Sequence, residues 1–357
     1  MRRSALPPVL LAIILPVGCA APMDSVARQE ALTRAVLADD VASIERHVRD
    51  GANPGALTIE GDPLLLLAVR AGHAEAAAAL LHAGAPVDAV SLTRRTPLLE
   101  ASASGDVEMA RMLLDAGASL AARDDAGMTP LNRAAWNGRA ALMRLLIQRG
   151  ASPCEATASG WTTLMSAARS GSIACIELLL AAECDLEAAW HDDSTALHIA
   201  AGYGSAAGLG RLLEAGAYID PVDNAGKTPL LAAIMQNRPD NVAALLEAGA
   251  WPDAQIDLGL SGLMMAAMYD RGEMMRDLLE AGASLDLRDS NGYTALHWAA
   301  EYGNAAGVKA LVDAGADPRN ATDDGITPVM LARERPGAAG EAIRRALGAW
   351  MMGGEEP

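Results

Sequence analysis

NGYTALHWAAEYGNAAGVKALVDAGA, residues 291–316, is the stretch of this sequence that decides the fold. Thr294 precedes an apolar run that closes at Gly303, and a second apolar run, Val308 to Val312, ends at Gly315. Glycine ends a helix readily because it adopts the left-handed backbone conformation without a side-chain penalty. The stretch therefore predicts two short helices joined by a turn.

The same spacing recurs every 33 residues along the chain. The residue that starts the first helix steps, without insertion or deletion, through Pro63, Thr96, Thr129, Thr162, Thr195, Thr228, Ser261, Thr294 and Thr327. The glycine that ends the second helix recurs at Gly51, Gly84, Gly117, Gly150, Gly216, Gly249, Gly282 and Gly315, and only Glu183 breaks that series. Copies in register at one period indicate a repeat array, in which each copy buries its apolar face against its neighbours.

Five copies carry a T-P-L-x-x-A motif or a close variant. They read TPLLEA (96–101), TPLNRA (129–134), TALHIA (195–200), TPLLAA (228–233) and TALHWA (294–299). With the 33-residue period, these motifs resemble the ankyrin-repeat family over roughly residues 27–347. The resemblance implies an all-α solenoid of about ten helix-turn-helix repeats with short β-hairpin loops. In such a repeat the threonine caps the first helix, and proline at the first helical position gives up an N–H group that has no partner there.

The two ends of the chain depart from the repeat. Residues 1–22 combine Arg2 and Arg3 with an apolar run from Val9 to Leu15, which is typical of a secretory signal peptide and too short to span a bilayer. Residues 23–57 keep the two-helix spacing without T-P-L, as expected of an N-terminal capping repeat. Repeats in strict period occupy 58–325. Residues 326–357 hold a truncated last repeat, a C-terminal capping helix and a tail.

Cys19 leaves two alternatives for the start of the exported chain. LPVGC (15–19) resembles the bacterial lipobox, in which a lipidated cysteine becomes the mature N-terminus, although Pro16 stands where that family usually carries leucine. The resemblance implies lipid attachment at Cys19 and, with Ala20 next, anchoring at the outer membrane. The alternative is ordinary cleavage after Ala20, which discards the cysteine and leaves a soluble periplasmic or secreted protein. A lipid at Cys19 is thus the only link to a membrane that the sequence predicts, and the second alternative has none.

The charge balance argues against nucleic acid as a partner. The chain has 45 acidic residues against 28 Lys plus Arg, a net charge of −17, and no basic patch that could neutralise phosphates. Its acidity suits a long exposed surface that must stay soluble.

No set of residues predicts catalysis, a cofactor or a metal site. Among the six histidines, His198 and His297 occupy the T-P-L-H position, where the resemblance implies a hydrogen bond between repeats, and His73 fills the slot before a second helix. The other histidines show no metal-ligand spacing. The glycine run GYGSAAG (202–208) does not follow a strand and is not a phosphate-binding loop. We therefore expect a protein that is not an enzyme.

The cysteines beyond Cys19 divide into a core residue and a pair. Cys175 lies on the apolar face of a second helix and is expected in the core. Cys154 and Cys184 fall in equivalent loop regions of adjacent repeats. Because an exported protein meets oxidising conditions, a disulfide between them is an alternative to two free thiols.

Aromatic and methionine side chains supply the strongest functional signal. The resemblance implies partner contacts at the hairpin tips and at the exposed end of the first helix. Those slots hold Trp136, Trp161, Tyr203, Met235, Met268, Tyr269, Tyr293 and Tyr302. Tyr and Trp are enriched at interface hot spots because they bury a large area with few rotatable bonds. We predict that these residues bind a partner on the concave face between Thr129 and Thr294, and the alternative is that the rings pack against neighbouring hairpins.

These features together predict a non-catalytic protein–protein interaction module of the bacterial envelope. We expect a monomer, because capping repeats at both ends block end-to-end stacking. The alternative function is an inhibitor or immunity-type protein that blocks a secreted toxin or enzyme. The scattered surface side chains do not identify the partner.

Overall fold

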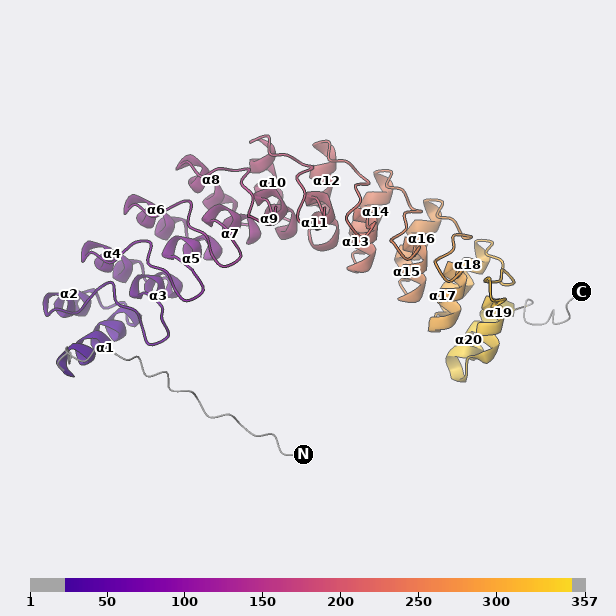
Figure 1. The fold of residues 1–357 in the computed structure, drawn as a ribbon, viewed down its shortest axis with the longest axis horizontal. Helices are drawn as coiled ribbons and strands as arrows, with labels where there is room; N and C mark the ends of the chain where they lie inside the picture. The colour runs from indigo at the N-terminus through magenta and orange to yellow at the C-terminus, as the bar shows by residue number, and fades with distance from the viewer. Residues whose placement is uncertain (1–22, 349–357) are drawn as a thin grey trace, which may run out of the picture. The chain divides into compact units, whose positions relative to one another are not determined.

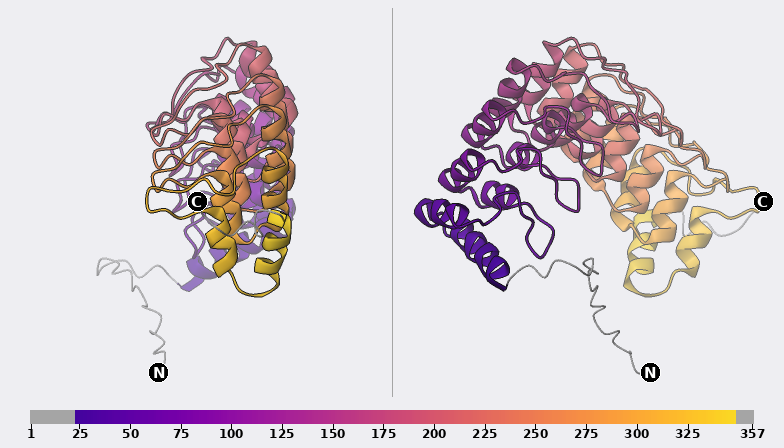
Figure 2. Two further views of the ribbon diagram at one scale, coloured as in Figure 1. Left: turned by 90° about the vertical axis from the view of Figure 1, so that its right-hand side faces the viewer. Right: turned by 60° about the vertical axis from the view of Figure 1, so that its left-hand side comes forward.

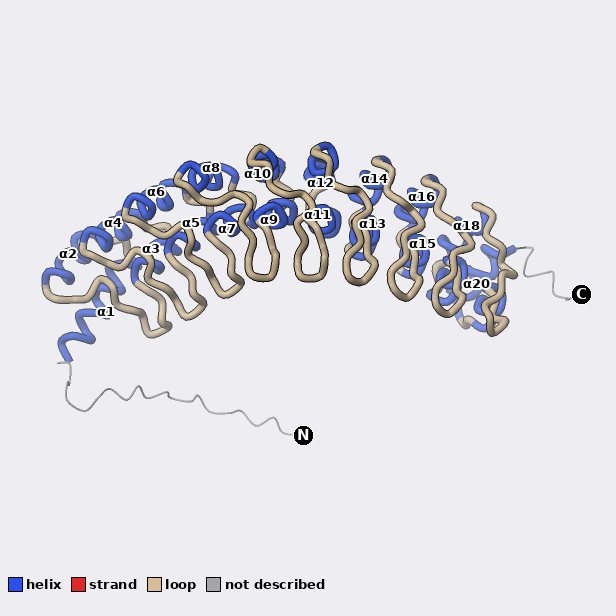
Figure 3. The backbone as a smooth tube through the Cα atoms, turned by 45° about the horizontal axis from the view of Figure 1, so that its top comes forward, coloured by secondary structure: helices blue, strands red, loops and turns tan. Residues whose placement is uncertain are grey.

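The computed structural model describes residues 23–348, which form helices and loops and, within that range, no extended strand (Figure 3). The described residues divide into two compact units, one ending at Pro97 and the other beginning at Leu98. The boundary falls at the first residue of helix α5 (Pro97–Ser104).

The first unit consists of two helix pairs, and the first helix of the first pair is the long one. Its helices are α1 (Met23–Leu37), α2 (Val41–Arg49), α3 (Leu64–Ala71) and α4 (Ala74–His82). Helix α1 packs on α2 and α3, and α2 packs on α4. Leu32, Ile44, Leu66 and Leu80 are fully buried between them. The apolar faces expected of a capping repeat and its neighbour therefore form one small core.

The second unit stacks the remaining helix pairs in the order of the chain (Figure 1). Its helices are α5 (Pro97–Ser104), α6 (Val107–Asp115), α7 (Pro130–Trp136), α8 (Ala140–Gln148), α9 (Thr163–Ser170), α10 (Ile173–Leu180), α11 (Ala196–Tyr203), α12 (Ala206–Glu214), α13 (Pro229–Met235), α14 (Pro239–Glu247), α15 (Gly262–Met268), α16 (Gly272–Glu280), α17 (Ala295–Tyr302), α18 (Ala305–Asp313), α19 (Pro328–Glu334) and α20 (Gly337–Leu347). First helices pack on first helices and second helices on second helices of the next repeat. The loops project from one side of the helix layers (Figure 2).

The capping chemistry expected of the repeat is present at the helix starts. The Thr162 side chain accepts a hydrogen bond from the Met165 N–H at 3.1 Å, and Ser261 accepts one from Met264 at 3.3 Å although it replaces the usual threonine. Proline occupies the first turn of α7, α13 and α19. Such caps each contribute roughly 1 kcal/mol by satisfying a backbone donor that the helix leaves unpaired.

The left-handed turn after the second helix is kept even where glycine is missing. Gly150 and Gly216 adopt φ values of +99° and +96°. Glu183, the exception in the sequence, adopts φ +54°, and its N–H donates to the Leu180 carbonyl at 3.0 Å as that of Gly216 does to Leu213 at 2.9 Å. The backbone of the repeat therefore imposes a conformation that is unfavourable for a residue with a side chain.

The expected β-hairpins occur as tight turns with single bridges. Isolated bridges join Ala156 to Thr162 and Gln255 to Ser261. In the repeat that follows the Ala156–Thr162 bridge, the Trp190 N–H donates to the Ser194 carbonyl at 3.0 Å across the equivalent turn. These turns hold the residues that precede each first helix.

Side chains of one repeat complete the helix end of the preceding repeat. Arginine guanidinium groups donate to carbonyl oxygens at or beside the ends of first helices, pairing Arg139 with Ala103, Arg238 with Gly204, Arg271 with Met235 and Arg335 with Glu301. Asn241 of α14 likewise donates from Nδ2 to the Ala201 carbonyl at 2.8 Å. The last carbonyls of a helix have no partner within it, so these bonds fasten neighbouring repeats.

The predictions for the chain ends concern mostly residues outside the described range. The signal peptide, with lipid attachment at Cys19, falls in residues 1–22, and the tail falls in 349–357. Between residues 23 and 348, no helix combines the length and apolar character needed to cross a bilayer.

Candidate functional site

Three tryptophans from successive repeats form a row in the second unit. Trp136 ends α7, whereas Trp161 and Trp190 lie in the turns before α9 and α11. The ring centroids of Trp136 and Trp161 are 5.6 Å apart, and those of Trp161 and Trp190 are 5.1 Å apart with an edge-to-face angle of 86°. Such aromatic pairs contribute roughly 0.5–1.5 kcal/mol beyond the area they bury.

The prediction that Trp161 presents an exposed ring is wrong. The side chain is 8% exposed, and its Nε1–H donates to Ser166 Oγ at 2.8 Å. The ring is covered because the tryptophans of both neighbouring repeats pack on it. Trp161 therefore packs between Trp136 and Trp190, as the alternative of rings packed against neighbouring repeats predicted.

Two partly exposed tryptophans were missed from the sequence. Trp190 lies five residues before Thr195, one position beyond the hairpin-tip positions that were predicted to contact a partner. Its Nε1–H donates to Ser159 Oγ at 3.3 Å. Trp298 stands one helical turn before Tyr302 on α17, and that spacing places both rings on one helix face. Trp298 could have been found in the sequence from this spacing.

Arg169 lies between two of the predicted rings. Its guanidinium carbon is 4.0 Å from the centroid of the Trp136 ring and 5.8 Å from that of Tyr203. A cation over an aromatic face is attracted by the ring quadrupole. The arginine of one repeat thus links the aromatic residues of the repeats on either side.

The aromatic face is the surface that these residues leave exposed on the second unit. Its members are Trp136, Trp190, Tyr203, Met235, Met268, Tyr269, Tyr293 and Tyr302, of which Tyr203, Met235, Tyr269 and Tyr302 are about half exposed and the others partly buried. Tyr203, Tyr269 and Tyr302 all stand eight residues after the Thr or Ser that starts the repeat. The structure places these side chains at the solvent, and binding of a partner by them stays a prediction.

A second aromatic group surrounds Tyr302. The ring centroids of Tyr293 and Trp298 are 5.5 Å apart, and those of Trp298 and Tyr302 are 5.7 Å apart. The Trp298 Nε1–H donates to Asp289 Oδ2 at 3.0 Å. Burial raises the pKa of Tyr293, and the carboxylates of Glu301 and Asp289 act in the same direction. This end of the aromatic face is therefore edged with negative charge.

The two histidines of the T-P-L-H position hold neighbouring repeats together, as the resemblance implied. His198 Nδ1 accepts from the Thr195 N–H at 3.1 Å, and Nε2 donates to the Lys227 carbonyl of the next repeat at 2.9 Å. His297 does the same with Thr294 and Ile326. Burial lowers the pKa of both histidines, and the backbone hydrogen bond opposes the shift. Their role is structural.

The cysteine pair and the core cysteine occupy different surroundings. The Sγ atoms of Cys154 and Cys184 lie 2.06 Å apart in the structure, and their Cα atoms are 5.1 Å apart, within the range of a disulfide. Cys175 is buried, and burial raises the pKa of its thiol. Formation of the bond in the cell stays a prediction.

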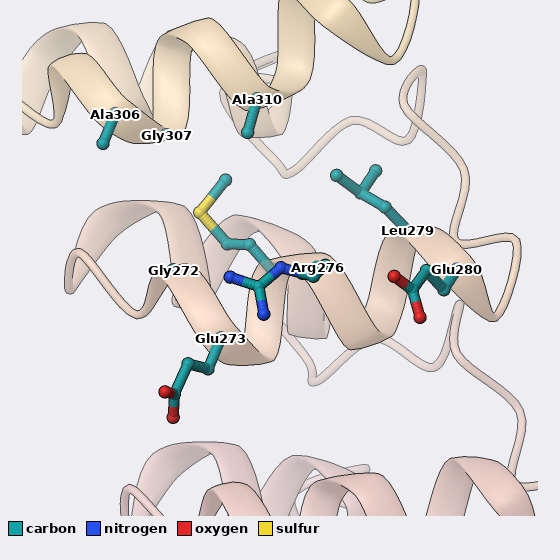
Figure 4. A pocket seen from close by; sticks show the side chains of 9 residues that line it. Gly272, Glu273, Arg276, Leu279, Glu280, Ala306, Gly307 and Ala310 are labelled. Carbon is teal, nitrogen blue, oxygen red and sulfur yellow. The ribbon is translucent and has the colours of Figure 1, made fainter.

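A large groove lies between the second helices α16 and α18, away from the aromatic face (Figure 4). It has a volume of about 690 Å³, with Ala306 and Ala310 of α18 on one side and Gly272 and Leu279 of α16 on the other. Small residues on α18 leave this space open. Among residues 23–348, no group of three or more His, Cys, Asp and Glu side chains is arranged to hold a metal ion.

Comparisons with known proteins agree with this architecture. The family model for ankyrin repeats in three copies matches residues 32–124, 120–190, 183–257 and 263–339. The crystal structure of the human ASB11 ankyrin repeat domain is 29% identical, with 63% of this chain and 100% of that chain covered and a TM-score of 0.57. The ankyrin repeat domain of Bcl-3, a member of the IkappaB protein family, is 32% identical over 57% of this chain and 92% of that chain, with a TM-score of 0.48. No curated protein matches the chain.

Proposed function

Because the chain belongs to the ankyrin repeat family, whose repeats are generally protein–protein interaction modules, we propose that it binds a protein partner through the aromatic face of its second unit. The fold is typically a non-catalytic scaffold, and binding is the whole of the proposed activity. The partner would meet a surface that is already formed, so little ordering entropy is lost on association.

The observation that carries the proposal is the repetition of half-exposed tyrosines. Tyr203, Tyr269 and Tyr302 are 50%, 54% and 54% exposed at the same position of three different repeats. A tyrosine buries a large area with two rotatable bonds and keeps a polar tip, which suits an interface. Trp136 and Trp190, which pack on the buried Trp161, extend this surface toward the preceding repeats.

We place this binding in the bacterial envelope on the sequence of residues 1–22. Their basic start, apolar run and LPVGC segment support export, with lipid attachment at Cys19 as the proposed anchor at the outer membrane. The net charge of −17 supports a partner with a basic surface. The second candidate function is therefore an immunity-type role, in which the chain blocks a basic secreted toxin.

Crosslinking in the native envelope tests the proposal. The full chain is compared with a variant that carries Tyr203→Ala, Tyr269→Ala and Tyr302→Ala. The matched control carries Tyr218→Ala and Trp251→Ala, two aromatic residues of similar exposure that follow the second helices α12 and α14. We expect one dominant crosslinked protein that the control keeps and the triple variant loses. Equal capture by all three chains would refute binding through the aromatic face.

A further inference from the structure

A small pocket lies at the centre of the aromatic face. It opens between the turn before α11, helix α11 and helix α13, and has a volume of about 110 Å³. Trp190, Ile199, Tyr203 and Met235 supply its apolar walls, and Gly202 lies among them.

The pocket exists because one repeat lacks a side chain that the others have. In the repeats around it, the position seven residues after the Thr or Ser that starts the first helix holds Trp136, Arg169, Met235, Met268 and Glu301. The same position in α11 is Gly202. A Cβ added to Gly202 would lie 3.3 Å from Gln236 Cγ and 3.8 Å from the Ala232 carbonyl oxygen, and both residues line the pocket. Any side chain at position 202 would therefore enter this space.

Neither backbone conformation nor crowding accounts for the glycine. Gly202 is inside a helix and is not among the glycines with positive φ. Only the flexible Gln236 side chain would have to move slightly to admit a methyl group. Glycine inside a helix is less favourable than alanine, so Gly202 lowers the stability of α11 at a position where the missing side chain opens a pocket.

The size and edges of the pocket determine what fits. A dry cavity of about 150 Å³ holds benzene, so the smaller volume here suits an aliphatic side chain better than an aromatic ring. Lys227 at its edge is already paired with Asp223, with the Lys227 Nζ 2.7 Å from Asp223 Oδ2. Asp192, also at the edge, uses Oδ1 to accept from the Ser194 N–H at 3.0 Å. With the charge of Lys227 neutralised by Asp223, Asp192 adds a negative charge at this edge of the pocket. Arg169 lies on the far side of Tyr203, with its guanidinium carbon 5.8 Å from the centroid of that ring.

We propose that this pocket receives one leucine or valine side chain from a basic segment of the protein partner. The inference rests on the proposed function and names the chemistry of the partner at one point of the aromatic face. The apolar walls bury the aliphatic side chain, and Asp192 attracts the flanking lysine or arginine.

Selection from a displayed library of random linear peptides on the full chain tests this pairing. The decisive variant is Gly202→Met, which installs the residue found at the same position of the next repeat and fills the pocket. Its control is Gly210→Met, the same substitution in α12 of the same repeat, where an added Cβ meets nothing within 4 Å. Thermal unfolding of both variants is measured first, and Gly202→Ala replaces Gly202→Met if the latter unfolds.

We expect the selected peptides to share a leucine or valine beside lysine or arginine. They should bind the Gly210→Met chain as they bind the unchanged chain, and bind the Gly202→Met chain roughly tenfold more weakly, the scale of a buried aliphatic side chain. Failure to select such peptides, or equal binding to both variants, would overturn the proposal. The tyrosine crosslinking experiment is independent of this result, so loss of the pocket would leave binding through the aromatic face standing.

Discussion

Glu183→Gly is expected to raise the free energy of unfolding of the second unit by about 1 kcal/mol. Glu183 adopts φ +54° in the turn where Gly150 and Gly216 adopt +99° and +96°. A left-handed backbone costs a residue with a side chain roughly 1–2 kcal/mol. The greater flexibility of glycine in the unfolded chain offsets roughly 0.5–1 kcal/mol of that gain. Removing a carboxylate from a helix C-terminus adds about 0.3 kcal/mol.

Urea unfolding followed by tryptophan fluorescence measures this difference close to the change, because Trp161 lies in the turn before α9 and Trp190 in the turn between α10 and α11. Glu183→Ala is the first control, since it removes the carboxylate but keeps a side chain at positive φ. Gly216→Ala is the reverse control. An added Cβ there meets nothing within 4 Å, so its expected loss of about 1 kcal/mol, after the same offset for unfolded-chain flexibility, reflects the backbone alone.

Two results would contradict this reasoning. Equal stability of Glu183→Gly and Glu183→Ala would show that the charge, and not the backbone, makes Glu183 unfavourable. An unchanged free energy of unfolding in Gly216→Ala would show that the turn relaxes without strain. In either case the missing glycine would not weaken this repeat.

Three further predictions concern the polar and aromatic contacts of the second unit. Burial lowers the pKa of His198 and His297, so the unfolded chain binds more protons below the ordinary histidine pKa of about 6.5, and stability should be full above that pH and fall below it. Urea unfolding at several pH values checks this, and a pH-independent stability from the neutral range down past that value would contradict it. The Cys154–Cys184 bond spans 30 residues, so Cys154→Ser should lower stability by about 3–4 kcal/mol, and two maleimide-reactive thiols at these positions in unreduced, denatured protein would show that the bond does not form. Trp161→Ala should lower stability by roughly 3–5 kcal/mol by leaving a cavity between its neighbours, and a loss below about 1 kcal/mol would contradict the burial of this ring.

The helices could be predicted from the sequence because their signals are local. Thr162 and Ser261 cap the helices that follow them, and the period places every later helix once one is found. The hairpins could be predicted as turns, but their short ladders depend on backbone pairing that sequence does not reveal. The inter-repeat bond of His198 followed from the family resemblance.

The depth of each aromatic side chain could not be predicted in the same way. A repeat position indicates which face a ring occupies, whereas the burial of Trp161 depends on Trp190, which comes from another repeat and lay outside the positions considered. Gly202 was visible in the sequence as part of a glycine run. Its significance appears only when Met235 and Tyr203 are seen to stand around the space it leaves.

The bonds between repeats have a direction along the chain. His198 needs a carbonyl that the following repeat provides, and the carbonyls at the end of α11 need Arg238 and Asn241, which also come from the following repeat. A buried histidine N–H that lacks an acceptor is not hydrated and stays unpaired at a cost in stability. The repeat that carries His198 is therefore completed only when the following repeat has been synthesised and has packed against it.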